Sequence, residues 1–268
     1  MDDVYQYPDE KEWMMASLIE QSEPQPGYWQ SSETAAFARL DRDLEALLPS
    51  RDKVRALDAG CGRGRLLPWV ARYSAAITAS DADSRRLNIA VRDHTDIDGT
   101  TVAFEYSGIE SLNDASYDLI VCSHVIQHVP MENVSPILRR LTDLASPESV
   151  MVLFFNRSAF GEERYGLSYL EDGGARVEEV DQARYQEVVT RRVKVDALPF
   201  RLIDPEVLVS EVSALGWSME WQWTYHVDDE SGDGIVDAER DEVINGTPSL
   251  LSRANGDIVT LWRRVPNA

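Results

Sequence analysis

Apolar residues follow two alternating patterns from Val54 onward: short β-branched runs, and longer stretches with helical spacing. The short runs predict strands over residues 54–58, 76–80, 102–107, 118–123 and 150–156. The stretches between them predict helices over residues 66–73, 83–94 and 134–144. Strand, helix and strand at this spacing imply a parallel sheet with right-handed crossovers. The pattern therefore predicts an α/β fold.

The flanking segments differ from this alternation. Residues 1–53 predict a short helix over 12–20 and a second one from Ser32 to about Leu48. Residues 157–203 are polar and irregular, with a strand-like run over 187–193. A helix follows the N-cap Asp204 and ends at Gly216, and two more strands are predicted over 217–227 and 258–265. We divide the chain into a helical cap (1–53), a core (54–156), an insertion (157–203) and a C-terminal completion of the sheet (204–268).

A glycine loop follows the first predicted strand. Gly60, Gly62 and Gly64 alternate with other residues immediately after Asp58, and a helix comes next. Glycines let a nucleotide lie against the backbone, and a helix N-terminus offers free N–H groups. Asp81 ends the second predicted strand about 17 residues after Gly64, where a carboxylate that binds ribose is expected. Arg65 occupies the sixth position from Gly60, so the dinucleotide fingerprint fails.

The Gly-x-Gly-x-Gly spacing behind Asp58 resembles the first motif of the class I S-adenosylmethionine-dependent methyltransferases. Residues 116–123 resemble the fourth strand of that family, 123–130 the segment beneath the transferable methyl, and 150–156 the fifth strand. The resemblance implies a Rossmann-like, seven-stranded, mostly parallel sheet with helices on both faces. It also implies a helical cap at the N-terminus and a substrate cap inserted after the fifth strand.

The resemblance implies S-adenosyl-L-methionine as the cofactor and S-adenosyl-L-homocysteine as its product. The ends of strands one, two and four should meet at one edge of the sheet, where such folds bind ligands. The residues expected to bind the cofactor are Asp58, Ala59, Gly60, Cys61, Gly62, Gly64, Asp81, Ala82, Gly108, Ile109, Ser123 and His124. Gly108 stands where many members carry an acid for adenine, which leaves the Ile109 N–H, Glu110 or a looser contact as alternatives.

The expected reaction is methyl transfer to a small-molecule acceptor. Two alternatives stay open: another S-adenosyl chemistry such as aminopropyl transfer, and a non-catalytic partner subunit that only binds the cofactor. Methyl transfer depends chiefly on alignment, and a base is needed only for a protonated acceptor. His124 and His128 are the candidates for that base, against a structural or cofactor-contact role.

Candidate acceptor contacts come from the cap and the insertion. Tyr28 and Trp29, expected in a loop, could roof the site or anchor the following helix. Arg157 could pair with an acidic group of the acceptor or lie exposed on the surface, and Tyr165 and Tyr169 could line the acceptor pocket.

Composition narrows the choice of partners. The net charge of −21 makes a nucleic-acid partner unlikely, and 43% apolar residues suffice for a sizeable core. No apolar run approaches the roughly 20 residues that span a bilayer, so we expect no membrane partner. The acidic N-terminus lacks the pattern of a signal peptide, so we expect a cytoplasmic protein. The excess of acids fits either adaptation to high salt or codon bias.

Cysteine and tryptophan usage adds two expectations. Cys61 and Cys122 are expected to be small buried thiols, and the histidines and cysteines show no metal-ligand spacing. Trp217, Trp221 and Trp223 alternate along a strand, which favours core packing over an oligomer face. The oligomeric state stays open, with a homodimer possible.

Overall fold

The computed structural model describes residues 28–95, 97, 99–158, 162–171, 174–193, 195–228 and 255–265. The predicted helix over 12–20 lies outside these ranges, as do most of residues 226–242, a stretch that carries eight acidic residues. None of the helices within them is both long and apolar enough to cross a lipid bilayer.

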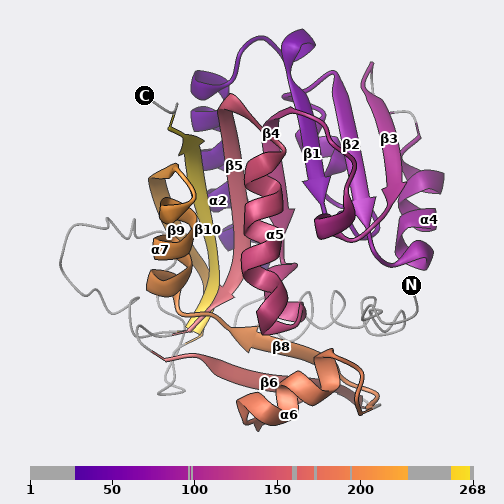
Figure 1. The fold of residues 1–268 in the computed structure, drawn as a ribbon, viewed down its shortest axis with the longest axis vertical. Coiled ribbons are helices and arrows are strands. Elements are labelled where there is room, and N and C mark those ends of the chain that lie inside the picture. The colour runs from indigo at the N-terminus through magenta and orange to yellow at the C-terminus, as the bar shows by residue number, and fades with distance from the viewer. Residues whose placement is uncertain are drawn as a thin grey trace.

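A seven-stranded sheet forms the centre of the fold, in the order β3-β2-β1-β4-β5-β10-β9 (Figure 1). Strands β1 to β5 run parallel, while β10 pairs antiparallel with both β5 and β9. Their bounds are β1 (Arg55–Ala59), β2 (Ala76–Asp81), β3 (Thr101–Tyr106), β4 (Tyr117–Ser123), β5 (Ala145–Arg157), β9 (Trp217–Asp228) and β10 (Asn255–Arg264). The predicted Rossmann-like sheet is confirmed, including its closure by the two C-terminal strands.

Helices cover both faces of this sheet. The core on one face includes residues of α2 (Tyr28–Leu47), α3 (Leu67–Val70) and α4 (Ser84–Asp93). The core on the other face includes residues of α5 (Met131–Asp143) and α7 (Pro205–Ala214), which stand in front of the sheet in Figure 1. The predicted N-cap Asp204 is confirmed, because its side chain accepts a backbone N–H bond at the start of α7. Asp83 caps α4 in the same way. Short 3-10 turns, η1 (Arg51–Lys53), η2 (Ile109–Ser111) and η3 (Ile126–His128), complete the core.

Helix α2 begins before the predicted position and packs directly on the sheet. Leu40 and Leu44 are fully buried, and Asp43 accepts a 2.7 Å bond from the indole N–H of Trp221. Trp217 and Trp221 are both buried, which confirms that they belong to the core. The division into cap, core, insertion and completion stays a prediction.

The insertion is more regular than its sequence suggests. It forms a three-stranded antiparallel sheet in the order β7-β6-β8, together with α6 (Gln182–Val189). The strands are β6 (Arg164–Glu171), β7 (Gly174–Val180) and β8 (Leu198–Leu202). The strand-like interpretation of residues 187–193 is wrong, because Asp181 caps a helix there and Val188 and Val189 are buried on its inner side. Packing on β6 decides the conformation here, and it overrides the β-propensity of the two valines.

Candidate functional site

A cavity of about 440 Å³ lies at the carboxyl ends of β1, β2 and β4. Gly60, Asp81 and Ser123 all line it, so the three distant loops meet as predicted. The other predicted residues in its lining are Asp58, Cys61, Ala82, Gly108, Ile109, His124 and His128. Ala59, Gly62 and Gly64 support the same loop without lining the cavity. Sequence reasoning missed Arg86, Asn133, Ile137 and Val189, which reach the cavity from three helices.

The glycine loop has a backbone that other residues would not adopt easily. Gly60 has a φ of +78°, and a Cβ added there would lie 2.3 Å from Cγ2 of Val125. The N–H groups of Gly60 and Cys61 both donate to the carbonyl of Ser80 at 2.8 Å, which ties the loop to the end of β2. The glycines are therefore required by positive φ and by close approach to neighbouring loops.

Asp58 is a buried carboxylate that lacks a full set of partners. It is 1% exposed, and its Oδ2 accepts no hydrogen bond in the described structure. Burial, followed by the charge of Asp81, raises the pKa of Asp58 to about 7. A buried acceptor without a donor is costly, and a cationic ligand removes that cost. The site thus fits a ligand that brings an ammonium or sulfonium charge to this carboxylate.

Asp81 is held in place by the loops around it. Its Oδ2 accepts from the Gly62 N–H at 2.8 Å, and its Oδ1 accepts from the Asp83 N–H at 2.7 Å. Burial raises the pKa of Asp81, which Arg86 and the two backbone donors partly oppose. Each carboxylate oxygen keeps a second lone pair, which suits the paired hydroxyls of a ribose. Binding of ribose by Asp81 stays a prediction.

The turn after β3 forms another wall of the cavity. Gly108, Ile109 and Glu110 all line it, and Ile109 is buried while Glu110 is exposed. The lining includes both alternatives for adenine recognition, the Ile109 backbone and the Glu110 carboxylate.

A family model described as a methyltransferase domain matches residues 32–186, more than half of the chain. The chain belongs to the class I methyltransferase family. Among curated relatives, a ubiquinone biosynthesis O-methyltransferase of Cereibacter sphaeroides is 36% identical over 94 residues, which make up 34% of this chain and 37% of the relative. The chain thus matches about a third of the length of such relatives.

Solved structures of methyltransferases share this fold. An S-adenosylmethionine-dependent methyltransferase from Clostridium acetobutylicum aligns with a TM-score of 0.56 at 13% identity, over 96% of this chain and 98% of that one. A Burkholderia thailandensis 1,6-didemethyltoxoflavin-N1-methyltransferase, solved with its substrate and S-adenosylhomocysteine, aligns with a TM-score of 0.52 at 15% identity, over 98% of this chain and 93% of that one. At such identities the likeness concerns the fold.

His124 lines the cavity in an uncommon backbone conformation. Its φ is +54°, in the left-handed region, and its N–H donates to the carbonyl of Phe154 at 2.9 Å. Its Nδ1 lies 2.9 Å from Nε2 of Gln127, a side chain that is 1% exposed. A non-glycine residue in this region persists only where its surroundings enforce it, and such residues cluster at functional sites.

His128 has the features of a neutral, structural imidazole. Its Nδ1 lies 2.7 Å from the carbonyl of Pro199, which fixes the proton on Nδ1. Burial lowers the pKa of His128 to about 4. An imidazole with this pKa is a weak base at neutral pH, which leaves His124 as the other candidate base. Both base assignments remain predictions.

The predicted acceptor contacts are dispersed rather than gathered at the cavity. Arg157 is fully buried and donates to the hydroxyl of Thr224 at 2.6 Å, so the expectation of surface exposure is wrong. Arg157 ends β5 with Gly256 of β10 paired on one side and Ile203 bridged on the other, so both of its sides are covered. The cavity lining does not include Arg157, Tyr165 or Tyr169.

Tyr165 and Tyr169 are engaged within the insertion. The hydroxyl of Tyr165 donates to Glu163 at 2.7 Å, and the Arg176 guanidinium lies 4.3 Å from the ring centre of Tyr169. Tyr28 and Trp29 begin α2 instead of lying in a loop, and their side chains lie outside what the structure describes. An acceptor role for these residues stays a prediction.

Both cysteines are free and buried, as expected. Burial raises the pKa of the Cys122 thiol to about 12, so it stays protonated. Within the described ranges, no three side chains of His, Cys, Asp or Glu gather as they would around a metal ion.

Proposed function

We propose that this chain transfers a methyl group from S-adenosyl-L-methionine to a small-molecule acceptor. The observation that carries the proposal is the convergence of the glycine loop, Asp81 and Ser123 on one cavity, next to the buried Asp58 carboxylate. The match to the methyltransferase domain family supports it independently.

Different residues of the cavity are assigned to different parts of the cofactor. Asp58 offers its carboxylate to the cationic part of the cofactor, and Asp81 offers lone pairs to ribose hydroxyls. Gly60 allows close approach of the ligand to the backbone. We assign the cavity wall that contains Ile109 and Glu110 to the adenine ring. When bound, S-adenosyl-L-methionine supplies a methyl group already activated by its positive sulfur.

The protein's part in the reaction is alignment and exclusion of water. Ser123 and His124 leave β4 at the cavity, where the acceptor would approach. For a hydroxyl acceptor, we assign His124 the role of base: an imidazole nitrogen would take the proton while the oxygen forms its bond to the methyl carbon and the carbon–sulfur bond breaks. The relatives named O-methyltransferases support oxygen as the first acceptor atom to test.

A turnover assay tests the proposal. The purified protein is incubated with S-adenosyl-L-methionine labelled in its methyl group and a panel of phenols, catechols and carboxylic acids. We expect a labelled methyl ester or ether together with S-adenosyl-L-homocysteine. Release of methylthioadenosine would instead favour aminopropyl-type chemistry, and binding without any turnover would favour a partner subunit.

The buried free thiols suit a reducing compartment, and we propose that the reaction takes place in the cytoplasm.

A further inference from the structure

The chain between β4 and α5 forms a wall of the cofactor cavity. Within this segment, defined as residues 126–131, His128, Val129 and Pro130 line the cavity. The segment contains the short turn η3 and the first residue of α5. Such a short connection has few hydrogen bonds of its own, so what fixes its position matters for the cavity.

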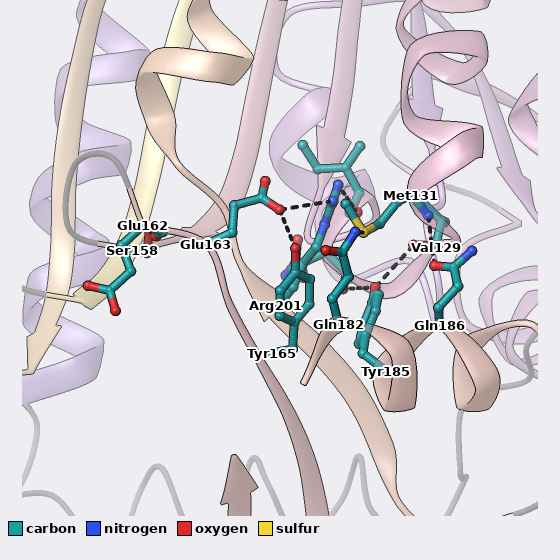
Figure 2. A network of polar contacts seen from close by, with 12 residues as sticks. Val129, Met131, Ser158, Glu162, Glu163, Tyr165, Gln182, Tyr185, Gln186 and Arg201 are labelled. Atoms are coloured by element: carbon teal, nitrogen blue, oxygen red, sulfur yellow. Dashed lines mark hydrogen bonds and ion pairs between the residues drawn. The ribbon is translucent and has the colours of Figure 1, made fainter. Parts of the chain in front are cut away.

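The insertion supplies those fixing contacts (Figure 2). The hydroxyl of Tyr185 on α6 lies 2.9 Å from the carbonyl oxygen of Gln127 and 3.0 Å from that of Val129. These two carbonyls flank His128, whose own Nδ1 lies 2.7 Å from the carbonyl of Pro199 on β8. The three contacts hold His128 from both sides.

Weaker contacts extend the attachment to both ends of the segment. Arg201 on β8 places Nη2 3.5 Å from the Ile126 carbonyl, and the Met131 N–H donates to Oε1 of Gln186 at 3.4 Å. Figure 2 shows Tyr185 and Gln186 reaching the segment from the same helix, α6. The next turn of α6 also adds Val189 to the cavity lining.

Because Tyr185 is buried, its contacts contribute to holding residues 126–131 in place. Its side chain is fully buried, so water cannot easily replace its hydroxyl. Removing the hydroxyl takes away the one O–H donor that the two backbone carbonyls share, and buried carbonyls tolerate such a loss poorly. The segment would then shift or loosen, and the cavity wall would move with it.

We propose that Tyr185 is a positioning residue that couples docking of the insertion to cofactor binding. The inference rests on the proposed function, since it concerns the same cavity. A cap after the fifth strand then does more than cover an acceptor, because it also holds the cofactor wall in place. Coupling is reciprocal, so a bound cofactor must in turn stabilise the docked insertion.

Calorimetric titration with S-adenosyl-L-homocysteine tests the proposal on the full chain. We expect Tyr185→Phe to weaken binding about fivefold to thirtyfold, the range that one lost buried hydrogen bond produces. Tyr73→Phe is the matched control, because it also removes the hydroxyl of a buried tyrosine, which donates to Asp41 on α2. The control should lower the melting temperature without changing the affinity.

Hydrogen exchange on the unmodified protein gives a second, independent measurement. Addition of S-adenosyl-L-homocysteine should slow exchange in α6 and β8 as well as in the glycine loop. Equal affinities for Tyr185→Phe and the unmodified protein, or protection confined to the glycine loop, would overturn the coupling. Absence of binding by the unmodified protein would instead refute the proposed function, so the two failures are distinguishable.

Discussion

Replacement of Asp58 by Asn should weaken cofactor binding and at the same time stabilise the free protein. The Asp58 carboxylate is fully buried with one oxygen unpartnered, and its pKa lies near 7. Asn has nearly the same shape but no charge, so the substitution isolates the role of the charge. A residue that costs stability while serving a ligand is typical of a binding site.

The effect on binding follows from the charge of the carboxylate. At pH 8 the group is largely ionised, and loss of a charged hydrogen bond of about 1.5–3 kcal/mol predicts roughly tenfold to hundredfold weaker binding. Below its pKa of about 7, Asp58 must lose its proton before it can hold a cation. Affinity of the unmodified protein should therefore fall about thirtyfold between pH 8 and pH 5.5, while that of Asp58→Asn stays nearly flat.

The effect on stability has the opposite sign. Burial raises the pKa of Asp58, so the folded chain keeps a proton that the unfolded chain has released. Stability from this group is therefore lost as pH rises from about 4 to 7. With the pKa raised to about 7, Asp58→Asn should stabilise the free protein at pH 8 by roughly 1–4 kcal/mol.

Two measurements on one pair of proteins decide this prediction. Calorimetry with S-adenosyl-L-homocysteine at pH 5.5 and 8 gives the affinities, and urea denaturation at the same pH values gives the stabilities. Unchanged affinity at pH 8, or a less stable variant, would refute the assignment of Asp58 as the carboxylate that meets the cation.

Three further predictions concern other parts of the molecule. Gly60→Ala should abolish calorimetric binding of S-adenosyl-L-homocysteine, because the added Cβ would lie 2.3 Å from the Val125 side chain. Gly99→Ala is the control, since Gly99 also has a positive φ, +72°, but open space around it. The control should cost about 1 kcal/mol of stability and leave the affinity unchanged. His128→Asn should flatten the loss of stability that follows acidification from pH 6.5 to 4, measured by urea denaturation, because the lowered pKa of His128 makes its protonation oppose folding. Arg157→Met should lower stability without changing cofactor affinity, because Arg157 is buried and donates to Thr224 outside the cavity lining. A large loss of acceptor turnover at unchanged stability and cofactor affinity would instead restore its predicted role at the acceptor.

Local sequence rules predicted the core of the fold because each rule had a local cause. The caps Asp83 and Asp204 mark helix starts, and Gly216, with a φ of +89°, follows the end of α7. The meeting of the glycine loop and Asp81 at one cavity was likewise predictable, because the carboxyl ends of parallel strands lie at the same edge of the sheet.

Tertiary contacts decided what the sequence left open. Val188 and Val189 favour a strand locally, yet both lie buried on helix α6, Val188 against Leu167 of β6 and Val189 at the cavity. Arg157 was expected on the surface, but it is buried because β10 pairs with it on one side and Ile203 forms a bridge on the other. No periodicity signals that Tyr185 reaches the carbonyls of Gln127 and Val129, since that contact joins elements more than fifty residues apart.

A crystal structure of the complex with S-adenosyl-L-homocysteine tests the central claim most directly. The account predicts ribose hydroxyls on the Asp81 carboxylate, the amino group within hydrogen-bond distance of Asp58, and the sulfur facing Ser123 and His124. A ligand bound outside the cavity at the ends of β1, β2 and β4, or bound there with its ribose away from Asp81, would contradict it.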